Sequence, residues 1–96
     1  MNKSYVLVFN TAYKSQKELT EILDKCRTVI TWRYDLTNAI YIISANTAFE
    51  IAVEIERFVG VNNGRYIILE YNGNSQGRLT EESWYFLNEK HVKPTT

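Results

Sequence analysis

The sequence has a single cysteine, Cys26, and a single histidine, His91, among its 96 residues. One residue of each kind cannot build an intrachain disulfide, a cysteine-rich zinc site or a Cys/His nucleophile pair within one chain. A lone thiol is also typical of a reducing compartment. We therefore expect neither a metal centre nor a cofactor.

Excess charge, long apolar runs and phosphate-binding loops are missing as well. Eleven Lys and Arg balance eleven Asp and Glu, so the strongly basic composition of a dedicated nucleic-acid-binding domain is absent, although a local basic face remains possible. The first apolar run, Tyr5 to Phe9, is too short for a signal-peptide core or a membrane span. Gly73 and Gly77 lack the Lys-Ser/Thr of a P-loop. We expect a cytoplasmic protein with no membrane partner.

What is present favours one folded domain over residues 1–96. Hydrophobic residues make up 45% of the chain and aromatic residues 14%, which is too apolar for a disordered segment. The length suits a single modest core. We find no internal repeat and no second domain.

The first half of the chain predicts a strand and then a helix. The β-branched and aromatic run from Tyr5 to Phe9 is typical of a central strand buried on both faces. Ser15 and Glu18 have the spacing of a capping box at a helix start. The apolar stripe expected on this helix is Leu19, Ile22, Leu23 and Cys26.

A hairpin, a second helix and a fourth strand follow. The strand-like runs 28–34 and 39–45 are separated by a short polar turn at 35–38. Thr47 and Glu50 form a second capping box, and Gly60 stands where a left-handed helix end is expected. The run 65–71 then predicts the last strand.

The order β-α-β-β-α-β over residues 4–71 predicts an α+β, ferredoxin-like sandwich. Right-handed crossovers give a four-stranded antiparallel sheet with both helices on one face. The other face is also partly apolar, and exposed apolar surfaces of this kind usually mark an interface.

Residues 72–90 predict a C-terminal segment that supports a dimer. Thr80 is placed to cap a short helix or arm, and four large apolar residues follow in succession. A helix is not expected to bury all four in its own domain, so we expect the segment to pack on a partner subunit or along the sheet edge. Residues 91–96 should be frayed. The expected dimer contacts are Trp32, Tyr34, Trp84, Tyr85, Phe86 and Leu87.

The layout resembles two related groups of ferredoxin-fold proteins, the SinR-like group and the small CRISPR-associated nucleases of spacer acquisition. The resemblance covers residues 4–90. It rests on Phe9-Asn10-Thr11 ending the first strand, on Trp32 before the returning strand 39–43, on strand 66–71, and on the ending 77–87, which has the Gly-x-Leu, acid, Trp, Leu order of SinR-like members.

The resemblance implies a homodimer whose sheets are brought together. In the catalytic relatives, an aspartate at the end of the first strand comes from each subunit, and the pair holds a divalent metal that activates water. Hard cations need such anionic oxygens, but this sequence has Asn10 at that position and no acid before Ser15. We therefore expect a chain without nuclease activity, in which Asn10 caps a local turn.

Three functions remain open at this stage. The first is a non-catalytic homodimeric module that binds a protein partner or duplex nucleic acid. The others are a metal-dependent nuclease and a small-ligand sensor. Basic side chains and helix N-termini hold phosphates, and the candidate nucleic-acid contacts are Lys14, Lys17, Arg33, Arg65 and Arg78.

Overall fold

The computed structural model describes residues 1–60 and 62–94, which form the expected α+β, ferredoxin-like fold. Four antiparallel strands lie in the order β2-β3-β1-β4. The elements along the chain are β1 (Lys3–Phe9), α1 (Gln16–Leu23), β2 (Thr31–Arg33), β3 (Ala39–Ser44), α2 (Ala48–Val59), β4 (Tyr66–Tyr71) and α3 (Glu81–Glu89).

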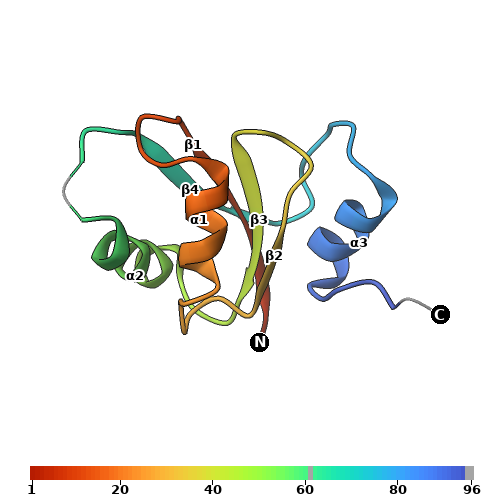
Figure 1. Ribbon diagram of the computed structural model, residues 1–96. Coiled ribbons are helices and arrows are strands. Elements are labelled where there is room, and N and C mark those ends of the chain that lie inside the picture. The colour runs from red at the N-terminus through yellow and green to blue at the C-terminus, as the bar shows by residue number, and fades with distance from the viewer. Residues whose placement is uncertain (61, 95–96) are drawn as a thin grey trace.

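Helices α1 and α2 cover one face of the sheet, and α3 lies on the opposite side (Figure 1). Each of the first two helices begins with a complete capping box, Ser15 with Glu18 and Thr47 with Glu50. The side-chain oxygen of each cap satisfies a backbone N–H that has no partner within the helix. The two predicted helix starts are confirmed.

The main core lies between the sheet and these two helices. Alternate residues of β1 point into it, namely Tyr5, Leu7 and Phe9, and all three are buried. Strand β1 is central, with β3 on one side and β4 on the other, as the apolar run predicted.

Two predicted boundaries are wrong. Helix α1 ends at Leu23, so Cys26 is not on its stripe. The chain tightens through bonds from the Lys25 and Cys26 amides to Ile22 and Leu23, and this turn still places the thiol in the core. The second strand spans only Thr31–Arg33, within the expected 28–34.

The second sheet face, which the sequence predicted to form an interface, is partly covered by the chain's own α3. Helix α3 packs its own Phe86 and Leu87 against Tyr41 and Ile43 of β3, in a second core on that face. The hydroxyl of Ser4 donates to the Leu87 carbonyl at 2.7 Å and fixes the helix to β1. Of the four large apolar residues in the tail, Phe86 and Leu87 are buried, and Trp84 and Tyr85 are half-buried.

The C-terminal tail follows α3. Of the expected frayed tail, 91–94 follow α3 without regular structure, while 95–96 lie outside the described residues. None of the helices in the described part of the chain is both long and apolar enough to cross a membrane.

Candidate interaction surface

Part of the second sheet face stays uncovered beside α3. Val8 of β1 is 41% exposed, and Ile67 and Leu69 of β4 are 52% and 51% exposed. Val8 lies directly opposite Ile67 in the strand pairing, while Leu69 lies opposite the partly buried Val6. We call Val8, Ile67 and Leu69 the bare patch. Three large aliphatic side chains that are about half exposed on a sheet form an apolar surface of the kind that usually marks an interface.

The bare patch lies at an open edge of the sheet. Among the described residues, β4 pairs only with β1, so its outer edge is free. A shallow hollow of about 360 Å³ adjoins it, formed by the end of β1 and the start of β4. Asn10 and Arg65 stand at its rim.

Asn10 closes the end of β1. Its Oδ1 accepts the amide protons of Tyr13, at 3.1 Å, and Arg65, at 3.2 Å. The backbone N–H of Asn10 donates to the Arg65 carbonyl at 3.1 Å. The side chain therefore joins the β1–α1 turn to the start of β4, which is the turn-capping role expected from the sequence.

The sequence resemblance predicted that Asn10 stands where related nucleases have a metal-binding aspartate, and this stays a prediction. Within the ranges 1–60 and 62–94, no group of three or more His, Cys, Asp or Glu side chains is arranged to hold a metal ion. A neutral amide oxygen that already accepts two N–H groups is a poor ligand for a hard cation.

Packing beneath this turn is tight. The rings of Tyr13 and Tyr66 pack at a tilt of 34°, with centroids 4.7 Å apart, and the Tyr66 hydroxyl donates to the Glu56 carboxylate. Burial, the hydrogen bond and the charge of Glu56 together raise the pKa of Tyr66, so its hydroxyl remains a donor at neutral pH. The turn is rigidly attached to α2.

The five candidate nucleic-acid contacts gather at one end of the sheet, where β1 and β2 finish and β4 starts. Arg33 ends β2, and Arg65 is bonded through its backbone to Asn10. Lys14 and Lys17 flank the start of α1, whose Gln16 bonds to the hairpin turn at the Leu36 carbonyl. Arg78 precedes Thr80, whose hydroxyl donates to Asp35 of the same turn. These contacts bring residues that are far apart in the sequence to the same end of the sheet.

The charge at this end is nevertheless mixed. Lys14 pairs with Glu18 at 3.8 Å, and Arg33 pairs with Asp35 at 3.9 Å. Two further carboxylates, Glu81 and Glu82, are in the first turn of α3 next to Thr80. The cations are close to acids and do not form a field of one sign.

The six side chains that were expected to contact a partner subunit differ in how far the chain itself buries them. Phe86 and Leu87 are buried by the same chain, and Trp32 packs against the main core while its Nε1 donates to Asp24 at 2.8 Å. Intrachain packing therefore leaves Phe86 and Leu87 no surface for a partner, whereas Trp32 is only partly buried and remains a predicted contact. Tyr34 is exposed and stacks on Trp32, and Trp84 and Tyr85 are half-buried.

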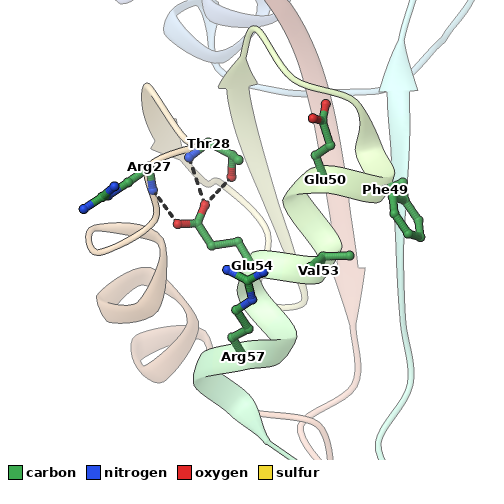
Figure 2. A pocket seen from close by; sticks show the side chains of 7 residues that line it. All are labelled: Arg27, Thr28, Phe49, Glu50, Val53, Glu54 and Arg57. Atoms are coloured by element: carbon green, nitrogen blue, oxygen red, sulfur yellow. Dashed lines mark hydrogen bonds between the residues drawn. The ribbon is translucent and has the colours of Figure 1, made fainter.

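A separate pocket lies between α2 and the α1–β2 loop (Figure 2). Glu54 points from α2 to the loop and accepts the amides of Arg27 and Thr28 and the Thr28 hydroxyl, at 2.6–2.9 Å. Burial pushes the pKa of Glu54 upward, but these hydrogen bonds together with Arg57 hold it below its ordinary value. The carboxylate is fully engaged in holding the loop.

The bare patch was not named residue by residue from the sequence. The alternation in 65–71 contained the signal, since Ile67, Leu69 and Tyr71 share one face of an extended strand. Which part of that face α3 would cover depends on tertiary packing. Comparisons with protein-family models, with curated proteins and with solved structures found no match to this chain.

Proposed function

We propose that this chain is a non-catalytic homodimeric interaction module of the SinR-like kind, in which the bare patch binds a second copy. The observation that supports the proposal is the half-exposed aliphatic trio of Val8, Ile67 and Leu69 at a free sheet edge. Removing apolar surface from water is favourable by about 25 cal/mol per Å², from which the entropy cost of association is subtracted.

The chemistry of the bare patch favours a second copy as its partner. A two-fold interface sets the same surface against itself, so like charges on it would repel. All three side chains of the bare patch are uncharged. A free β4 edge can also pair with another β4 in antiparallel fashion, which satisfies backbone groups that are otherwise left to solvent.

Sedimentation velocity of the whole chain between about 5 and 500 µM tests the proposal over the affinity range of a small interface. We expect dimers that dissociate on dilution. Leu69→Lys should give monomers throughout, because the charge would be desolvated at the contact. The matched control is Phe49→Lys, a change at a side chain that is 77% exposed on α2.

Two results would overturn the dimer. One is a wild-type monomer over the whole concentration range. The other is dimerisation that Phe49→Lys weakens as much as Leu69→Lys does. Circular dichroism of both variants would show that each retains the fold.

Duplex nucleic acid is the second candidate, and one observation favours it: Lys14, Lys17, Arg33, Arg65 and Arg78 lie at one end of the sheet. It ranks second because acids lie among these cations. Fluorescence anisotropy with a short duplex in a salt series is the test. Arg65→Ala should lower the salt slope by about 1, whereas Lys25→Ala, beyond the far end of α1, should not. Binding that ignores salt would end this candidate.

A nuclease of this kind would have to act without an aspartate at position 10. The amide oxygen of Asn10 already accepts two backbone N–H groups in the turn. Incubation of the protein with RNA and DNA in Mg²⁺ or Mn²⁺ tests it. Cleavage that disappears in Asn10→Ala would replace the proposal above with an enzyme.

A further inference from the structure

A groove lies between the sheet and the segment that leads into α3. Its volume is about 350 Å³, near the lower end of the range of small-molecule sites, about 300–1,000 Å³. Its walls are mainly apolar and include Leu36, Tyr71, Leu79 and Trp84. Figure 1 shows the segment between β4 and α3 on the side of the sheet away from α1 and α2.

Tyr41 of β3 also lines this groove, and its hydroxyl oxygen is buried. The side chain is 2% exposed. Its oxygen forms no hydrogen bond to any of the residues that the structure describes. A buried hydroxyl left unsatisfied costs about 1–3 kcal/mol, so folds normally give such a group a protein, water or ligand partner.

A second unsatisfied donor lies next to it. Arg33 is directly opposite Tyr41 in the β2–β3 pairing, and its buried Nε likewise lacks a partner among residues 1–60 and 62–94. The Arg33 charge is already offset by Asp35, 3.9 Å from its Nη2. Arg33 is not one of the residues that line the groove, so Tyr41 supplies the polar contact there.

The Tyr41 hydroxyl keeps its proton at neutral pH. Burial raises the pKa of Tyr41, and the nearby Asp35 carboxylate adds to this, while Arg33 opposes it. A protonated phenol and a guanidinium N–H are both donors. An acceptor in the groove would satisfy the phenol proton.

We propose that the groove is a binding site for a small uncharged aromatic molecule whose carbonyl oxygen accepts from the Tyr41 hydroxyl. The aromatic walls from Tyr71 and Trp84 suit a flat apolar ring. A carboxylate fits less well, because Asp35 would repel it. The site lies beside α3 and does not depend on dimerisation through the bare patch.

Benzamide is the probe, titrated into ¹⁵N-labelled full-length protein and followed by two-dimensional NMR. We expect weak, saturable binding with a Kd of about 1 mM, as befits a fragment of this size. Shifts should centre on residues 75–79, Tyr41 and the indole N–H of Trp84. Benzoate, which carries a charge, and ethylbenzene, which lacks the acceptor, should each bind several-fold more weakly.

Tyr41→Phe removes the hydroxyl and leaves the ring. Its affinity for benzamide should fall by about 5-fold to 10-fold, as expected for one lost hydrogen bond. The matched control, Tyr34→Phe, changes an exposed hydroxyl on the other side of the sheet and should bind as wild type does.

Three outcomes overturn the site. They are no saturable shift with benzamide, shifts confined to another surface, and equal affinity in Tyr41→Phe and wild type. Equal affinity for ethylbenzene and benzamide would also refute the acceptor chemistry and leave only an apolar groove.

Discussion

A few individual side chains hold the functional end of the sheet together. Asn10 accepts the amide protons of Tyr13, three residues away, and of Arg65, 55 residues away. The side chain of Asn62 donates to the Tyr13 carbonyl at 2.5 Å. Gly64 lies against the backbone of Tyr13. Each residue type could be read from the sequence, but its partner could not, because these partners meet only after the strands have paired.

Asn10→Ala should lower the free energy of unfolding by about 1 kcal/mol, since two backbone donors lose their acceptor at a site that water can partly reach. Asn10→Asp keeps an acceptor in the same place and should stay within about 0.5 kcal/mol of wild type. Urea denaturation measures both. An Asn10→Ala protein as stable as wild type would show that the turn does not need this amide.

Gly64→Ala should destabilise the fold by about 2 kcal/mol or more. A Cβ on residue 64 would lie 2.1 Å from the Cα of Tyr13, so backbone would have to move. Gly77→Ala is the matched control, with nothing within 4 Å of its added Cβ. Thermal unfolding of the pair gives the comparison, and equal melting temperatures would contradict the close approach.

Burial raises the pKa of the Cys26 thiol to about 11, and the charge of Glu54 adds to the effect. An unfolded thiol titrates near 8.5, so the stability associated with the protonated thiol is full below that pH and is lost as the pH rises towards 11. At pH 8, Ellman's reagent should label Cys26 much more slowly in native protein than in urea. Equal rates would place the thiol at the surface.

At the scale of elements, the sequence predicted the structure best where the structure depends on residues close together in the chain. Both capping boxes and the Thr80 cap of α3 are as predicted, because a cap joins residues three apart. The predicted second strand is too long by several residues, since only Thr31–Arg33 finds a partner in β3. Strand length depends on pairing, which local propensity does not determine.

Helix α3 is an integral part of the fold, because it covers Tyr41 and Ile43. Phe86→Ala should therefore cost about 3–5 kcal/mol of unfolding free energy. Phe49→Ala, at a largely exposed position on α2, should stay within about 0.5 kcal/mol. Chemical denaturation at low protein concentration separates folding from association. A small effect of Phe86→Ala would mean that α3 does not pack on its own sheet.

At the scale of the whole molecule, the two sheet faces differ in how they are covered. One carries the main core under α1 and α2, whereas α3 covers the other only in part. The bare patch and the groove are both consequences of this partial cover, at different places on the same face.

A dimer that forms through the bare patch should show a melting temperature that depends on concentration. Association stabilises the folded state by mass action. We expect a rise of about 4 °C or more for a hundredfold increase in concentration, given the sensitivity of a domain of this size. Scanning calorimetry measures it, and Leu69→Lys should remove the dependence. A constant melting temperature in wild type would count against the dimer.

The sequence by itself determined the element order, the helix starts and the central position of β1, because capping and apolar periodicity act between near neighbours in the chain. It also provides an amide, Asn10, and no acid at the end of β1. Only the tertiary structure decided that α3 returns to its own sheet, which buries Phe86 and Leu87 and leaves Val8, Ile67 and Leu69 in water. An amphipathic segment can pack on its own domain or on a partner, and the choice depends on shape and reach over many residues, which no local pattern encodes.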